Sequence, residues 1–188
     1  PSYYQTSANF CLAQCYYLTG SKELSSSIIE VKDAPHIQLP ADRKAKNKVE
    51  YLLKRNKSLL KVQLLFDGGS YSEALKLILN EDQSLFSKNE LLEYYYRLGR
   101  VYQELKRYRE AKANFLMVVF KSDNDSHSYF APNSCLQLGL IYFNERNFLK
   151  VKYYVDSGLR YRNYEHQTSI KVQLKKVLQL MDHEAIVE

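Results

Sequence analysis

Glycine, proline and cysteine are scarce in this sequence, and tryptophan is absent. The 188 residues include 6 Gly, 4 Pro and 3 Cys. A β-sandwich or β-barrel needs turn residues about every 8–12 positions, so this composition argues against all-β folds. Three cysteines are also too few for a disulfide scaffold. The share of apolar residues, 45%, and of charged residues, 26%, is instead typical of a globular protein with a real core.

Long apolar runs are missing as well. No stretch approaches the roughly 18 consecutive apolar residues that span a membrane, and no leader-like segment is visible. Because the sequence begins at Pro1 without a methionine, we interpret it as a soluble fragment or processed product. The intact protein is expected in the cytoplasm or at the cell envelope. The net charge of +6 is compatible with binding to nucleic acid or to an acidic partner.

Two pairs of segments in the second half of the sequence align with each other. Residues 95–102 and 135–142 both contain Leu-Gly, with a tyrosine three positions after the glycine. Residues 108–115 and 148–155 follow, each with an aromatic residue, a smaller residue three positions on and a final apolar residue. The pattern indicates repeated pairs of helices, and a repeat of this kind decides the whole fold.

The spacing of the repeat has a simple physical reading. Gly99 and Gly139 are 40 residues apart, against a usual period of about 34, and the polar stretch 122–128 accommodates the surplus as a longer loop. The two glycines are expected where paired helices approach closely. Ala111 and Val151 would fill the matching slot on the second helix. Such pairs bury their apolar faces only by stacking on neighbours.

The sequence therefore predicts an all-α solenoid of stacked antiparallel helix pairs with a C-terminal capping helix. Whether residues 41–66 form one helix or two is left open by the pattern. The expected divisions are a degenerate helix pair with a linker at 1–40, an array at 41–181 with units at about 41–90, 91–128 and 129–163 and a capping helix at 167–181, and a tail at 182–188.

Longer phrases carry a family resemblance. Residues 59–69, 93–102, 129–142 and 164–170 together resemble tetratricopeptide-repeat proteins, and in particular the C-terminal part of a poorly characterised bacterial family of them. The resemblance spans about residues 59–181. It implies an all-α superhelix that binds proteins, and it implies no catalytic residues.

The last repeat departs from the family pattern. Val151 and Gly158 stand where a small residue and then an alanine are usual, so we expect the last repeat to pack loosely.

In tetratricopeptide folds the first helices of the pairs line a concave groove. Aromatic and amide side chains there would hold an extended or helical peptide. The alternative is that neighbouring helices cover several of these residues. Only Arg97 and Arg100 could hold an anion, so capture of a C-terminal carboxylate is disfavoured. The residues predicted to line the groove are Phe10, Gln14, Tyr17, Leu59, Gln63, Phe66, Tyr96, Arg97, Arg100, Gln103, Asn133, Leu136, Leu140 and Phe143.

The cysteines do not indicate a metal site. Cys11 and Cys15 are four positions apart and share a helix face. A zinc ion needs about four ligands, and no nearby residues supply the others. We therefore predict that both are buried, inert thiols, and that Cys135 is another.

No catalytic motif is present in the sequence. The predicted function is a non-enzymatic scaffold or adaptor for a protein or peptide partner, with no cofactor, metal or small-molecule substrate. The alternative is a structural module that self-associates as a homo-oligomer or packs against the rest of a larger repeat protein. Nucleic-acid binding through the basic run at 43–61 is less favoured, because such runs are usually solvated helix faces.

Overall fold

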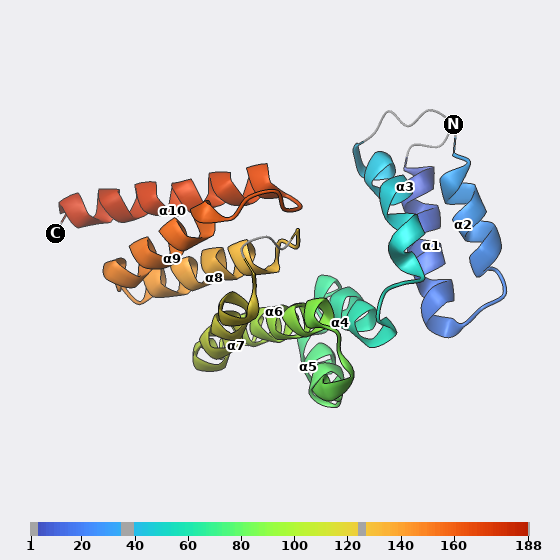
Figure 1. Cartoon of the computed structure of the whole chain (residues 1–188), viewed down its shortest axis with the longest axis horizontal. Coiled ribbons are helices and arrows are strands. Elements are labelled where there is room, and N and C mark those ends of the chain that lie inside the picture. Colours follow the sequence, from blue (N-terminus) through green and yellow to red (C-terminus); the bar gives the residue numbers. More distant parts are fainter. Residues whose placement is uncertain (1–3, 35–39, 124–126, 188) are drawn as a thin grey trace. The chain divides into compact units, whose positions relative to one another are not determined.

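The computed structural model describes residues 4–34, 40–123 and 127–187. These residues form ten α-helices and one short 3₁₀ helix, η1, and no strand occurs among them (Figure 1). The predicted all-α fold is confirmed. The helices are α1 (Gln5–Thr19), α2 (Leu24–Lys32), α3 (Pro40–Leu52), α4 (Lys57–Asp67), α5 (Tyr71–Leu79), η1 (Gln83–Leu85), α6 (Lys88–Glu104), α7 (Tyr108–Lys121), α8 (Phe130–Asn144), α9 (Phe148–Arg160) and α10 (Gln167–Val187).

The chain divides into two units, Pro1–Lys61 and Val62–Glu188. In the first unit α1, α2 and α3 pack against one another. Asp42, buried on α3, accepts hydrogen bonds from the backbone N–H and the hydroxyl of Ser7 at 2.8 and 2.6 Å. Our expected division at residue 40 differs from this arrangement, because α3 packs with the two helices that precede it. The linker expected before α3 falls largely on residues 35–39, outside the described residues.

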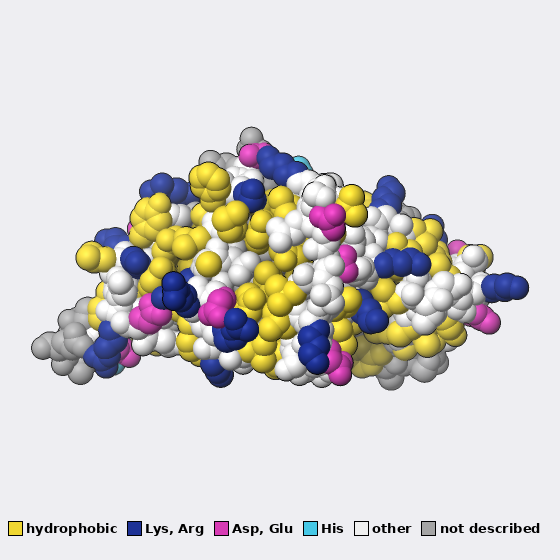
Figure 2. Space-filling view, turned by 90° about the horizontal axis from the view of Figure 1, so that it is seen from below, with side chains coloured by type: hydrophobic (Ala, Val, Ile, Leu, Met, Phe, Trp, Pro, Cys, Tyr) yellow, Lys and Arg dark blue, Asp and Glu magenta, His cyan; other side chains and the backbone are white. Residues whose placement is uncertain are grey.

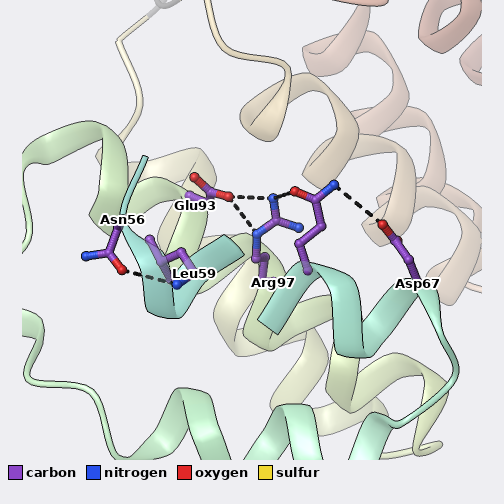
Figure 3. A network of polar contacts seen from close by, with 6 residues as sticks. Asn56, Leu59, Asp67, Glu93 and Arg97 are labelled. Carbon is purple, nitrogen blue, oxygen red and sulfur yellow. Dashed lines mark hydrogen bonds and ion pairs between the residues drawn. The ribbon is translucent and has the colours of Figure 1, made fainter. Parts of the chain in front are cut away.

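Residues 41–66, for which the sequence left one or two helices open, belong to two helices. Helix α3 ends at Leu52, and α4 begins at Lys57. Asn56 precedes α4 and accepts a hydrogen bond from the backbone N–H of Leu59 at 3.1 Å, which satisfies one free donor of the helix start. Figure 3 shows this contact. The polar residues between the helices therefore end α3 and then cap the start of α4.

The second unit is built from sequential helix pairs. Helix α6 packs on α7, α8 packs on α9, and α8 also contacts both members of the preceding pair. Helix α10 lies against α8 and α9 (Figure 1). At the start of α6, Ser87 and Glu90 form a capping box, in which each side chain bonds the backbone of the other. This is the tetratricopeptide-like helical repeat expected from the sequence.

The glycines of the repeat lie at close helix contacts. A Cβ added at Gly99 would lie 2.7 Å from a ring carbon of Phe115, and one at Gly139 would lie 3.1 Å from Val155. At Gly158 an added Cβ would lie 3.0 Å from atoms of both Cys135 and Leu174. The loose packing expected for the last repeat is therefore not found. Gly158 brings α9 close to α8 and α10.

The end helix is longer than expected. Ile170, Leu174 and Val177 of α10 are buried, as the capping role requires. The helix continues to Val187, so residues 182–187, expected as a tail, are helical.

The cysteine prediction is correct for one residue and wrong for two. Cys135 is buried, but Cys11 and Cys15 are exposed. Helix α1 turns Ala13 and Gln14 inward instead. Apolar residues occur all around α1, so the sequence pattern alone could not show which face is covered.

Candidate functional site

A buried arginine, Arg97, lies at the centre of a network of polar contacts in the second unit. Arg97 on α6 donates from Nε and Nη2 to Oε1 of Glu93 at 2.7 and 2.5 Å, and from Nη2 to Oε1 of Gln63 at 3.0 Å. The amide of Gln63 in turn reaches Asp67 at 3.4 Å (Figure 3). Only about 8% of Arg97 is exposed, so the carboxylate of Glu93 compensates its buried charge. These contacts connect the second half of α4 to α6.

A second chain of hydrogen bonds connects α6 to α8. The hydroxyl of Tyr96 accepts from Nδ2 of Asn133 at 3.0 Å and from Nη1 of Arg100 at 3.4 Å. Asn133 accepts from Gln137 at 3.1 Å, and Gln137 accepts from Gln103 at 3.0 Å. Each amide in this chain is therefore held in one orientation by its neighbours.

Between α4 and α6 the surface is hollowed into a recess. Its volume is about 190 Å³, and Arg100 lies over the ring of Phe66, 5.1 Å from the ring centroid. Small-molecule sites are typically about 300–1,000 Å³, so this recess suits a single side chain better than a whole ligand. Its lining residues are Gln63, Phe66, Asp67, Tyr96, Arg97, Arg100 and Tyr129.

Three aromatic rings, those of Phe66, Tyr96 and Tyr129, line the recess. The ring of Tyr96 lies 5.6 Å from that of Tyr129 in an edge-to-face arrangement and 5.2 Å from that of Phe130. Tyr96 itself is buried, while Phe66 and Tyr129 are partly exposed. A partner side chain entering the recess would therefore meet two partly exposed rings and the guanidinium of Arg100, which is about 26% exposed.

Five of the fourteen predicted groove residues line the recess: Gln63, Phe66, Tyr96, Arg97 and Arg100. Gln103 and Asn133 belong to the adjoining hydrogen-bond chain. Leu140 and Phe143 are half-buried elsewhere on α8.

Two predicted groove residues require a correction. Leu59 and Leu136 are 0% and 1% exposed, so they belong to the core and have no surface to offer a partner. Phe10, Gln14 and Tyr17 belong to the first unit, whereas the recess residues belong to the second. There the hydroxyl of Tyr17 donates to the backbone oxygen of Arg55 at 2.7 Å.

Two lining residues, Asp67 and Tyr129, were not predicted. Asp67 ends α4, and Tyr129 directly precedes α8. The groove residues were predicted only within helices, whereas Asp67 adjoins the Gly68-Gly69 break and Tyr129 lies before α8. The aromatic pair Tyr129-Phe130 at the start of a helix was the available signal.

Within the described part of the chain, no group of three or more His, Cys, Asp or Glu could hold a metal ion. Among the helices described, none is long and apolar enough to cross a membrane. Figure 2 shows Lys and Arg side chains interspersed with hydrophobic ones over the visible face.

The segment with the clearest repeat pattern is also similar to a known type of protein repeat. Residues 92–116 match the tetratricopeptide repeat. The match takes in most of α6 and the first part of α7, including Gly99 and Phe115, whose close contact joins the two helices. A tetratricopeptide repeat implies interaction with proteins, and the family is typically non-catalytic. No match was found among curated proteins or among solved structures. The likeness to a particular bacterial family stays a prediction.

Proposed function

We propose that the second unit is a scaffold that binds a segment of a partner protein along the second half of α4 and along α6 and α8. The recess carries this proposal, because aromatic side chains and a fixed cation meet there beside a row of oriented amides. Interfaces are enriched in Tyr, Phe and Arg, and a few such residues supply most of the binding energy. One apolar or aromatic side chain of the partner would enter the recess between Phe66 and Tyr129.

The hydrogen-bond chains support the proposal in a second way. Gln63, Gln103 and Asn133 are already held by neighbouring side chains. A peptide backbone that bonds to them would not have to order them first, and each such ordering costs about 0.5–1.5 kcal/mol. The unit would thus bind by shape and preorganised polar groups, without chemical turnover.

The test begins with a random peptide library selected on the immobilised 188-residue chain. A selected peptide is then synthesised, and its Kd is measured by fluorescence anisotropy for the wild type and for Phe66→Ala and Tyr129→Ala. We expect each variant to bind about tenfold more weakly, as a hot-spot residue would. Phe120→Ala is the matched control, because Phe120 is 85% exposed on α7, away from the recess residues. Circular dichroism confirms folding of each variant. Equal affinities for all four proteins would refute the recess as the binding site.

Self-association is a second candidate function, favoured by α1 of the first unit. Helix α1 contains no charged residue, and it exposes Cys11, Cys15 and 47% of Leu12. An uncharged, partly apolar helix face can pair with a copy of itself without charge repulsion. Sedimentation velocity over a range of concentrations would reveal the dimer, and Leu12→Lys should abolish it. A wild-type chain that stays monomeric at all concentrations would exclude this function.

A further inference from the structure

The end helix α10 has two chemically different faces. Its inner face is buried through Ile170, Leu174 and Val177, which pack toward α8 and α9. Its outer face carries two exposed apolar residues, Val172 at 62% and Leu180 at 46%. These two lie eight positions apart, about 2.2 helical turns, so their directions around the helix differ by about 80°, and both point away from the buried face.

Positive charge gathers beside these apolar residues. Lys171 and Lys175 are four positions apart on α10 and are neighbours on its surface. Lys175, Lys176 and Arg162 are exposed, and Lys171 is partly exposed. From residue 161 to 180 the only acidic residue is Glu165. Within the part of the chain that the structure describes, none of these four cations forms an ion pair.

The cations affect one another. The pKa of Lys171 is lowered, first by partial desolvation and then by the like charges of Arg162 and Lys175. No carboxylate acts on Lys171 in the opposite direction. Like charges held together disfavour one another, and an added carboxylate would relieve this repulsion.

We propose that the outer face of α10, together with Arg162, docks an acidic segment of a partner protein that carries apolar residues between its carboxylates. The carboxylates pair with Lys171, Lys175, Lys176 and Arg162, while the apolar residues cover Val172 and Leu180. Affinity for nucleic acid comes mainly from many phosphate contacts, about 6–10 in a typical salt-sensitive complex, and this cluster offers four cations. Binding to a membrane surface needs a wide apolar helix face, whereas α10 exposes only Val172 and Leu180 as large apolar side chains among its described residues. The surface shares no residue with the recess, so this proposal does not depend on the proposed function of the recess.

The test uses the full 188-residue chain and a fluorescent peptide. The peptide is designed as a helix that carries Glu and Leu side by side on one face. Binding is measured by anisotropy at about 50 mM and about 300 mM salt, because screening weakens contacts between exposed charges. We expect binding at the lower salt and a clear loss at the higher. Lys171→Glu/Lys175→Glu should weaken binding about tenfold or more, since two attractive pairs become repulsive. Lys171→Gln/Lys175→Gln should give a smaller loss of affinity. It replaces the Glu variant in the test if that variant does not fold.

The control variant has the same change in net charge at other exposed lysines. Lys76→Glu/Lys152→Glu alters α5 and α9, where both lysines are exposed, and should change affinity by less than about twofold. Equal losses in both double variants would mean that only net charge matters, and would overturn the proposal. So would a wild type that does not bind the peptide at low salt. Tighter binding to anionic lipid vesicles or to a single-stranded oligonucleotide than to the peptide would also overturn it.

Discussion

Asn133 donates a hydrogen bond from its side-chain amide to the hydroxyl of Tyr96 at 3.0 Å. The bond joins the first helix of one pair, α6, to the first helix of the next, α8. The ring of Tyr96 is meanwhile packed against Phe130 and Phe115, at centroid distances of 5.2 and 6.3 Å. Tyr96 thus combines an apolar contact inside the stack with a polar contact at its surface, which is typical of buried tyrosines.

Replacing Tyr96 with phenylalanine separates these two contacts. Tyr96→Phe keeps the ring but removes the acceptor for Asn133 and Arg100. We expect a loss of about 1 kcal/mol in the free energy of unfolding, measured by urea denaturation. Tyr153→Phe is the control, because Tyr153 is 65% exposed, and it should change stability by less than about 0.5 kcal/mol. A loss as large for Tyr153→Phe as for Tyr96→Phe would contradict the assignment.

An alanine at Gly99 should collide with Phe115. The added Cβ would lie 2.7 Å from a ring carbon, and Phe115 is fully buried. We expect Gly99→Ala to destabilise the fold by about 1–3 kcal/mol, even though alanine favours helix formation. The double variant Gly99→Ala/Phe115→Leu should cost less than the sum of the two single changes. Strict additivity in urea denaturation would show that the ring is not the obstacle.

The Arg97–Glu93 ion pair should stabilise the second unit more than a surface pair would. The side chains are only 10% and 15% exposed. Arg97→Met removes this buried ion pair, and we expect a loss of about 2–4 kcal/mol in unfolding free energy. Arg97→Met/Glu93→Gln should recover part of this loss. Arg107→Met is the control, because its pair with Glu110 is 48% and 38% exposed. Equal costs for Arg97→Met and Arg107→Met would contradict the prediction.

The three cysteines should react with thiol reagents at different rates. Cys11 and Cys15 are exposed, whereas Cys135 is buried and desolvation raises its pKa from 9.0 to about 12. At neutral pH, in the native state, we expect two thiols to be modified quickly and the third only after unfolding. Mass spectrometry of the labelled chain identifies the sites. Rapid native labelling at Cys135 would show that α8 is less well covered than described.

The raised pKa of Cys135 also predicts a dependence of stability on pH. The folded chain keeps this proton up to about pH 12, while the unfolded thiol loses it near pH 9.0. The contribution of Cys135 is therefore complete below about pH 9 and is lost as the pH rises from there toward 12. The unfolding free energy of the wild type should fall more steeply over this interval than that of Cys135→Ala. Parallel curves would contradict the burial of the thiol.

The repeat pattern predicted the helix pairs because it reports on contacts inside one pair. Gly99 and Phe115 are close in sequence, and the match to the tetratricopeptide repeat spans both. The same pattern did not show that Leu136 is fully buried, since α6, α7, α9 and α10 all pack around α8. A helical period shows that a face is apolar. It does not show how many neighbours cover that face.

Errors in the first unit have the same origin. The exposure of Cys11 and Cys15 depends on which side of α1 receives α2 and α3, and apolar residues occur on every side of α1. The packing of α3 on α1 depends partly on Asp42 and Ser7, which are 35 residues apart. Pairings of this kind leave no periodic signal in the sequence. In the recess, Asp67 and Tyr129 were missed because Asp67 adjoins the Gly68-Gly69 break and Tyr129 lies before α8.

The contact of Gly158 with both Cys135 and Leu174 has a consequence for altering the length of the array. Helix α10 occupies the position in which the first helix of a further repeat would dock, and it approaches α9 at a position with no side chain. An engineered extra repeat would therefore have to be inserted ahead of Gln167, with α10 carried along as the terminal element. Its second helix would also need a glycine or alanine in the place of Gly158.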